Sequence, residues 1–310
     1  AAEVRGVPSG VHFGVSGYSG TVEMRIERAF VTGAAGCSAM LRPLCALMGR
    51  EGNALRTVRL GGNGAWAAGD GATLAAALGA ASCVVAELDV SGSGLGADEA
   101  VALVSAGRAL QTLRLGEWVM PVGELRSGES VSTGGQAVGE ADGAVVGALL
   151  KASTSLTTLD LSGSMCAPGA LARILEGLRA SAAPLAELRL SGLRPGSDGS
   201  VFGPEVCADL VQSVLTLAAH LRHLDLGGQA VGTDEALAYV STCRALLTLK
   251  LGEWVMPVGE LRSGESVSTG GQAVGEADGA VVGALLKTST SLSTLDLSGS
   301  SCAAEAARLI

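Results

Sequence analysis

The sequence carries a series of charged residues that recur in a repeated phrase and alternate in sign. Each lies between two apolar residues, as Asp160 does in LTTLDL. The charged series consists of Arg59, Asp89, Arg114, Asp160, Arg189, Asp225, Lys250 and Asp296. If the phrases form adjacent parallel strands, about 4.8 Å apart, neighbouring members are close enough to form ion pairs. These pairs either only neutralise one another, contributing about 0–1 kcal/mol each, or form a mixed-charge surface for a partner.

Three other residues are candidates for partner binding. His223 lies near Asp225 and Glu187, where a polar surface cluster is a simpler interpretation than a catalytic one. Trp118 and Trp254 are two of only three tryptophans. Both are candidate anchors for a protein, because aromatic side chains often dominate the energetics of interfaces. The alternative, which we favour, is that they plug the edge of the repeat array where the repeat spacing is irregular.

The sequence offers little to an enzyme. Residues 92–97 match G-x-G-x-x-A, but Asp98 and Glu99 would place two carboxylates where a pyrophosphate should bind, so we reject dinucleotide binding. No serine lies in a nucleophile-elbow context, and no HExxH motif or acidic metal cluster is present. The sequence therefore predicts no catalytic residue, no cofactor and no metal.

Nine copies of an L-x-x-L-x-L phrase provide the elements that must position these residues. They span 21–26, 55–60, 85–90, 110–115, 156–161, 185–190, 221–226, 246–251 and 292–297. Glycine-rich turns and helical segments follow, with apolar residues three and four apart, as at 97–110, 167–183 and 204–220. Alternate residues of a strand face opposite sides, so the charged series should face away from the core.

The stretches LDVSGSGLGADEAVALV and LDLGGQAVGTDEALAYV resemble the ribonuclease-inhibitor-like leucine-rich repeats. The resemblance covers about residues 21–310 and implies an α/β solenoid, a horseshoe with a parallel concave sheet and convex helices. One turn position, which holds Asn or Cys in that family, is asparagine only at Asn63. Elsewhere this position holds Ser93, Trp118, Ser164, Leu193, Gln229, Trp254 and Ser300, so its hydrogen bonds must be made differently.

A longer period of 136 residues indicates an internal duplication. Residues 115–151 recur unchanged as 251–287, and similarity extends over about 88–166 and 224–302. In each copy one spacing between phrases reaches 46 residues, from Leu110 to Leu156 and from Leu246 to Leu292. Either a weak extra repeat without a helix lies there, or a protruding hairpin turns at Arg-Ser-Gly-Glu. We favour the extra repeat, which would interrupt the charged series with Ser132 and Ser268.

The predicted organisation is an N-terminal segment, residues 1–20, and one repeat domain, residues 21–310. The sequence stops within a predicted helix, so we expect a further part of the protein or another chain to cover that end. The net charge of −9 argues against a nucleic-acid partner, and the apolar runs are too short for membrane insertion. Seven scattered cysteines without a CxxC motif indicate free thiols and a cytoplasmic, intracellular protein.

These observations predict a non-enzymatic scaffold that binds a protein partner through the concave sheet or the two 46-residue segments. One alternative is a regulator of a GTPase, similar to the Ran GTPase-activating proteins, for which Arg126 and Arg262 are the candidate arginines. Another is an architectural subunit of a large assembly.

Overall fold

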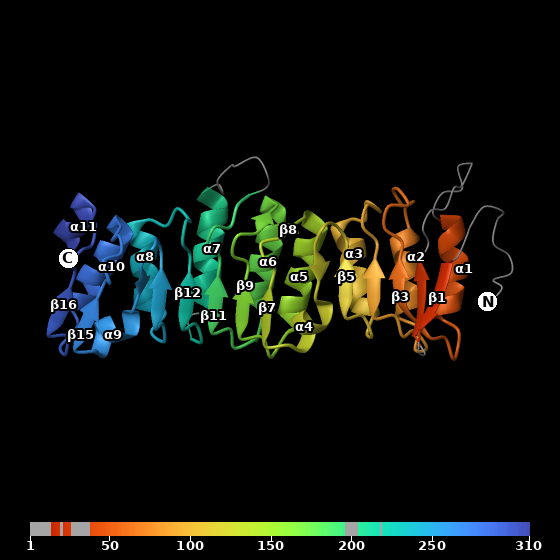
Figure 1. Ribbon diagram of the computed structural model, residues 1–310, viewed down its shortest axis with the longest axis horizontal. Helices are drawn as coiled ribbons and strands as arrows, with labels where there is room; N and C mark the ends of the chain where they lie inside the picture. The colour runs from red at the N-terminus through yellow and green to blue at the C-terminus, as the bar shows by residue number, and fades with distance from the viewer. Residues whose placement is uncertain (1–13, 19–20, 26–37, 196–203, 218) are drawn as a thin grey trace. The chain divides into compact units, whose positions relative to one another are not determined.

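The computed structural model describes residues 14–18, 21–25, 38–195, 204–217 and 219–310 (Figure 1). The chain divides into two compact units. The first comprises the residues up to Arg126 together with Ala137–Leu149, and the second comprises Ser127–Gln136 and Leu150–Ile310. Both units have mixed α/β structure with parallel strands.

The sheet of the first unit contains six strands in sequential order. They are β1 (Gly14–Tyr18), β2 (Thr21–Arg25), β3 (Leu55–Arg59), β4 (Glu87–Asp89), β5 (Thr112–Arg114) and β6 (Val119–Met120). Strands β2 to β5 run parallel, whereas β1 and β6 each pair antiparallel with their neighbour. The first four predicted strand phrases are therefore confirmed, and residues 14–18 extend the sheet into the predicted N-terminal segment.

The second unit contains a sheet with the order β14-β13-β12-β11-β9-β7 and a separate pair, β15 and β16. The strands are β7 (Ser130–Ser132), β9 (Thr158–Asp160), β11 (Glu187–Arg189), β12 (His223–Asp225), β13 (Thr248–Lys250), β14 (Val255–Met256), β15 (Ser266–Ser268) and β16 (Thr294–Asp296). Neighbouring strands are parallel except for β13 and β14. The other five strand phrases are thereby confirmed. Short strands β8 (Ala137–Val138) and β10 (Met165–Cys166) follow β7 and β9 along the chain.

Helices alternate with the strands along the chain. They are α1 (Ser38–Met48), α2 (Asp70–Leu78), α3 (Ala97–Ala106), α4 (Val122–Ser127), α5 (Glu140–Ala152), α6 (Pro168–Ala180), α7 (Pro204–Thr216), α8 (Thr233–Thr242), α9 (Val258–Ser263), α10 (Glu276–Leu286) and α11 (Ala304–Leu309). Helices α1, α2 and α3 pack in order in the first unit, and α6, α7, α8, α10 and α11 in the second. The helices predicted within 97–110, 167–183 and 204–220 are confirmed.

Helix α6 illustrates why these segments are helical. Pro168 opens the helix, where its missing N–H costs nothing. Leu171, Ile174, Leu175 and Leu178 follow at three- and four-residue spacing, and all four are buried. Each such burial contributes about 1.5–3 kcal/mol, so packing on one face selects the helix.

The strands orient the charged series through their buried leucines. Leu188 is completely buried, and Leu190 is 1% exposed. Because successive side chains of a strand point to opposite faces, Arg189 between them must point away from the core. The same alternation holds at Asp160 and Asp225.

The 46-residue spacings contain the extra strand favoured from the sequence. Strand β7 pairs in parallel with β9, and β15 pairs in parallel with β16. The expectation of a repeat without a helix is wrong, however, because the 13-residue helix α5 follows β7. The shortened repeat is the preceding one, in which only the six-residue helix α4 precedes β7. The hairpin turned at Arg-Ser-Gly-Glu is also wrong, since Arg126 and Ser127 belong to α4.

Candidate functional site

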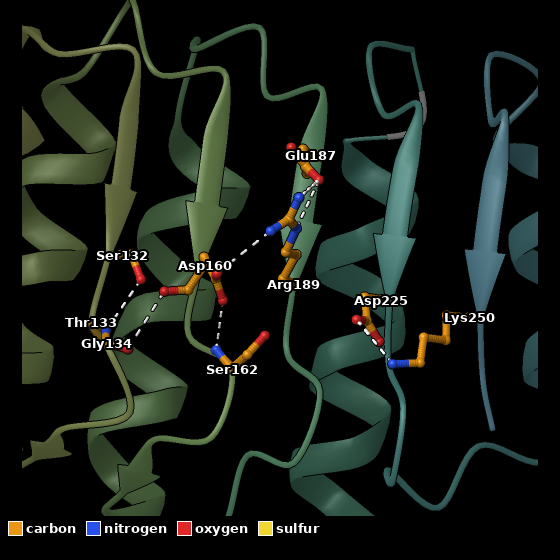
Figure 2. Close-up of polar contacts among 9 residues, drawn as sticks. All are labelled: Ser132, Thr133, Gly134, Asp160, Ser162, Glu187, Arg189, Asp225 and Lys250. Atoms are coloured by element: carbon orange, nitrogen blue, oxygen red, sulfur yellow. Dashed lines mark hydrogen bonds and ion pairs between the residues drawn. The ribbon is translucent and has the colours of Figure 1, made fainter. Parts of the chain in front are cut away.

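The charged series of the second unit forms ion pairs between adjacent strands (Figure 2). Arg189 Nη1 lies 3.8 Å from Asp160 Oδ2, and Lys250 Nζ lies 3.6 Å from Asp225 Oδ2. These residues are direct neighbours in the strand register. Glu187 joins the cluster, with its Oε1 2.6 Å from Arg189 Nη2. The hydrogen bond and charge of Glu187 raise the pKa of Arg189.

The first unit repeats this arrangement. Arg114 Nη1 lies 3.8 Å from Asp89 Oδ2, whereas Arg59 Nη2 lies 4.0 Å from Glu87 Oε2. Pairing between adjacent members, predicted from the sequence, is thus confirmed for Asp89 with Arg114, Asp160 with Arg189 and Asp225 with Lys250, but Arg59 pairs with Glu87, which is not a member of the series. The sequence predicted Glu187 near His223 and Asp225, but not the ion pairs of Glu87 with Arg59 and of Glu187 with Arg189. The signal available for these ion pairs was that both residues are acidic at a strand position where most other repeats have threonine.

The aspartates of the charged series also close the turns that follow their strands. Asp160 Oδ1 accepts a hydrogen bond from Ser162 N at 2.8 Å (Figure 2). Asp89, Asp225 and Asp296 make the same contact with the N–H two residues later. This is an Asx turn, for which Asp is well suited. The acidic residues therefore have a structural role in addition to their charge.

The extra strand interrupts the charged series as predicted. Ser132 lies opposite Asp160, and Ser268 lies opposite Asp296. Ser132 Oγ accepts a hydrogen bond from Gly134 N at 3.1 Å, which replaces the aspartate turn with a serine turn (Figure 2). The charged surface of the second unit therefore begins at β9.

The candidate histidine is a polar surface residue. His223 Nδ1 lies 2.8 Å from Thr248 Oγ1, and His223 is the register partner of Glu187. Within the described part of the chain, no group of three or more His, Cys, Asp or Glu side chains could hold a metal ion. His12 lies outside the described residues. His223 remains a candidate for partner binding.

The tryptophans do not belong to the exposed surface. Trp118 is 4% exposed and Trp254 is 2% exposed, so neither is presented to a partner. Both fill the interior beside the antiparallel strands β6 and β14, where the repeat is irregular. The exposed residues are instead the neighbouring Val119 and Val255. Tryptophan is common at protein interfaces, but the burial of Trp118 and Trp254 removes both from the candidate site.

Arg126 and Arg262 are bound within their own units. The Arg126 guanidinium donates hydrogen bonds to the carbonyls of Val104, Gly107, Arg108 and Leu110, where helix α3 ends. Arg262 repeats these contacts at the end of α8. Burial lowers the pKa of both arginines. Neither is free to act as the inserted arginine of a GTPase regulator.

Several polar side chains replace the asparagine of the turn position. Asn63 Nδ2 donates to Leu60 O at 2.8 Å, whereas Gln229 Nε2 reaches the carbonyls of Leu190 and Leu193, each at 3.1 Å. Ser164 instead forms a buried hydrogen bond with the hydroxyl of Thr133, and Thr269 and Ser300 do the same in the second copy.

Replacing Thr133 by valine is expected to lower the free energy of unfolding by about 1–2 kcal/mol, because the buried Ser164 hydroxyl loses its partner. Chemical denaturation measures the change. Adding Ser164→Ala should restore most of the loss, since neither polar group then remains unpaired. Thr269→Val is the matched control and should cost less, because Ser300 is partly exposed to solvent. Equal losses at both sites would contradict this explanation.

The glycine-rich segment 92–97 is a repeat turn. Gly92 and Gly94 have φ values of 73° and 72°, a backbone region that glycine adopts without strain. The N-terminus of α3 is capped by its own side chain, since Glu99 Oε2 accepts a hydrogen bond from Gly96 N at 3.3 Å. A carboxylate therefore occupies the place that a phosphate would need.

The described cysteines are free thiols. Cys166 and Cys243 are buried, whereas Cys45, Cys83 and Cys302 are partly exposed. Burial raises the pKa of Cys45 and of Cys243 to about 11 each, which keeps both protonated at neutral pH. Cys37 and Cys207 lie outside the residues whose side chains are described.

Comparison with known proteins gives only structural likenesses. No protein-family profile matches the sequence, and no curated protein is significantly similar to it. The tropomodulin C-terminal domain of Caenorhabditis elegans has 13% identity and a TM-score of 0.31, covering 57% of this chain and 92% of its own. The actin-binding site 2 of leiomodin-1 has 12% identity and a TM-score of 0.29, with coverage of 58% and 90%. An internalin of Listeria monocytogenes has 14% identity and a TM-score of 0.30, with coverage of 85% and 59%.

TM-scores of this size do not assign the chain to a family.

Among the described residues, no helix is long and apolar enough to cross a membrane.

Proposed function

We propose that this chain is a non-enzymatic protein-interaction module whose partner binds the charged series. The observation that carries the proposal is the exposure of the arginines despite their ion pairs: the side chains of Arg59, Arg114 and Arg189 are 45%, 43% and 48% exposed. Exposed pairs contribute only about 0–1 kcal/mol each, so a partner's charges can join or replace them at little cost. The buried leucines meanwhile hold the backbone in place.

The charges also suit recognition of a protein. Both signs alternate along the charged series within each unit, so a partner must match a pattern and not only a net charge. A nucleic acid would need a uniformly basic surface, and the interspersed aspartates oppose this. A partner strand or loop with complementary charges satisfies the pattern best.

Two finer assignments belong to this proposal. The strand–turn–helix order supports leucine-rich repeats of the ribonuclease-inhibitor-like kind, with a horseshoe that places the charged series on its concave side. The free thiols of the described cysteines support a cytoplasmic location.

Removing charges from the second unit should abolish partner binding. The variant Asp160→Asn, Arg189→Gln, Asp225→Asn keeps the turns after β9 and β12, because an asparagine oxygen accepts the same N–H hydrogen bond. The matched control, Arg173→Gln with Glu176→Gln, removes exposed charges from helix α6. Cross-linked pull-down from the lysate of the source cell, read by mass spectrometry, compares both variants with the unchanged chain.

A partner recovered by the unchanged chain and the helix control, but lost with the strand variant, would support the proposal. Equal recovery by all three proteins would show that the charged series is only structural. Thermal unfolding of the strand variant checks that the fold is intact.

A further inference from the structure

Two exposed valines lie on the strands that end the two six-stranded sheets. Val119 of β6 is 55% exposed and Val255 of β14 is 51% exposed, more than any other large apolar side chain among the described residues. Each lies between two buried residues, which are Trp254 and Met256 in the second copy, and therefore points away from the core. A valine on this outward face is exceptional, because the outward positions of the neighbouring strands are polar.

A basic side chain lies beside each valine on the same face. Val119 is the register partner of Arg114 in the antiparallel pair of β5 and β6, and Val255 is that of Lys250 in the pair of β13 and β14. Side chains of register partners project from the same face of a sheet, with Cβ atoms about 4.5–5.5 Å apart. We call these two combinations of a basic residue and a valine the hairpin sites.

The basic groups of the hairpin sites retain unused hydrogen-bond donors. Lys250 Nζ lies 3.6 Å from Asp225 Oδ2, which is too far for a hydrogen bond, and it donates to no acceptor within the described residues (Figure 2). Arg114 donates from Nε to Gly116 O at 3.2 Å, but its Nη1 lies 3.8 Å from Asp89 Oδ2. Both basic groups are thus attracted to an aspartate without being hydrogen-bonded to it.

The surroundings of Arg189 show which chemistry satisfies such donors. Glu187, two residues earlier on the same strand, lies 2.7 Å from Arg189 Nε and 2.6 Å from Nη2 (Figure 2). Thr112 and Thr248 occupy the equivalent position in the strands of the hairpin sites, so this carboxylate is missing there. A carboxylate supplied by a partner would take the place that Glu187 has beside Arg189.

We propose that each hairpin site binds an extended segment of the partner protein in which an acidic residue lies two positions from an apolar one. Residues two apart in a strand share a face and lie about 7 Å apart, which suits a carboxylate on the basic group and an apolar side chain on the valine. Pro121 and Pro257 lack the N–H that strand pairing would need after β6 and β14, so the side chains provide the recognition. This inference rests on the proposed interaction function and specifies the partner's chemistry, with one segment bound to each unit.

One acidic residue in each hairpin opposes this ligand. Glu117 and Glu253 lie in the turns between the paired strands, are exposed, and form no ion pair within the described part of the chain. Their negative charge repels a partner carboxylate and limits its affinity. Glu253→Gln should therefore strengthen binding at the second hairpin site about twofold.

NMR of the full chain with isotope-labelled valine methyl groups tests the proposal. The probe is a peptide with the core Leu-Thr-Glu flanked by glycine and serine, and the control peptide has the core Leu-Thr-Lys. We expect the glutamate peptide to shift the Val119 and Val255 methyl signals saturably at millimolar concentration. The lysine peptide should bind about fivefold more weakly, the difference that one exposed ion pair makes. Val119→Ile and Val255→Ile assign the two signals.

The two copies serve as controls for each other. Lys250→Ala should weaken binding at Val255 about fivefold and leave the response of Val119 unchanged, whereas Arg114→Ala should have the opposite effect. Leu247→Gln is the matched control for an exposed apolar side chain outside the hairpin sites, since Leu247 is 45% exposed and the first copy has glutamine there. It should leave binding of the glutamate peptide unchanged.

Two results of the titration would overturn the proposal: no saturable shift at either valine, or equal affinity for the two peptides. Pull-down separates this inference from the proposed function. A partner retained by the double variant Val119→Ser, Val255→Ser, but lost with the strand variant of the charged series, would refute the hairpin sites and leave the proposed function standing. Loss of the partner with both variants would support the two together.

Discussion

Replacing Arg126 by alanine is expected to lower the free energy of unfolding by about 3 kcal/mol, because several carbonyls at the end of α3 lose a charged donor at once. The last carbonyls of a helix have no partner within the helix, so they need one from elsewhere. The positive guanidinium also complements the partial negative charge of a helix C-terminus. Arg126 therefore joins the short helix α4 to the preceding repeat.

Urea denaturation followed by circular dichroism measures this loss. Arg108→Ala is the matched control, because the Arg108 side chain is exposed, and its replacement should change stability by less than about 0.5 kcal/mol. The duplication provides a second test, in which Arg262→Ala and Arg244→Ala should behave in the same way. If Arg126→Ala were as mild as Arg108→Ala, the proposed capping role would be wrong.

The second large effect concerns a pair of buried carboxylates. Asp142 and Asp278 occupy equivalent positions in the two copies and are 3% and 2% exposed. In each, Oδ2 accepts one N–H hydrogen bond, from Gly139 or Gly275 at 3.0 Å. The Oδ1 atoms have no hydrogen-bond partner within the described protein. Burial raises the pKa of Asp142 to about 6, against the opposing effect of the Gly139 hydrogen bond, and also raises the pKa of Asp278.

Asp142→Asn is therefore expected to gain about 2–3 kcal/mol of stability relative to the unchanged chain as the pH rises from 4 to 7. The unfolded carboxyl has its usual pKa of 3.8, so between that value and about 6 the folded state binds a proton that the unfolded state does not. Stability of the unchanged chain must then fall as the pH rises through this range. Asparagine has no charge to bury and keeps the acceptor for Gly139.

Denaturation of both proteins at several pH values measures the difference between their free energies of unfolding. Taking this difference cancels the contributions of all other titratable groups. The control is Asp98→Asn, because Asp98 also lies in the first turn of a helix but is exposed. A constant difference between Asp142→Asn and the unchanged chain from pH 4 to 7 would show that Asp142 is not held in an unfavourable charged form. Asp278→Asn should follow the same trend.

The sequence by itself determined the strands and the orientation of the charged series. Leucines with a period of two specify which face of each strand is buried, and this choice places Asp160 and Arg189 on the other face whatever the distant packing. Asp160 and Arg189 have the same spacing from the leucines of their own strands, so they lie opposite each other in the register and their ion pair was predictable. The extra strand was predictable because residues 131–139 (VSTGGQAVG) resemble the strand and turn of residues 224–232 (LDLGGQAVG).

Only the tertiary structure decided which polar and aromatic residues are available. Trp118, Arg126 and Asp142 lie within residues 115–151, the block that recurs unchanged as 251–287. The pattern of apolar and polar residues in this block does not indicate which of the three side chains are buried. Their environment depends on neighbouring repeats: Trp118 is covered, Arg126 reaches the end of the preceding helix, and Asp142 is enclosed beside Gly139. Contacts between residues distant in sequence produce this burial, and hydrophobic periodicity within one segment does not report it.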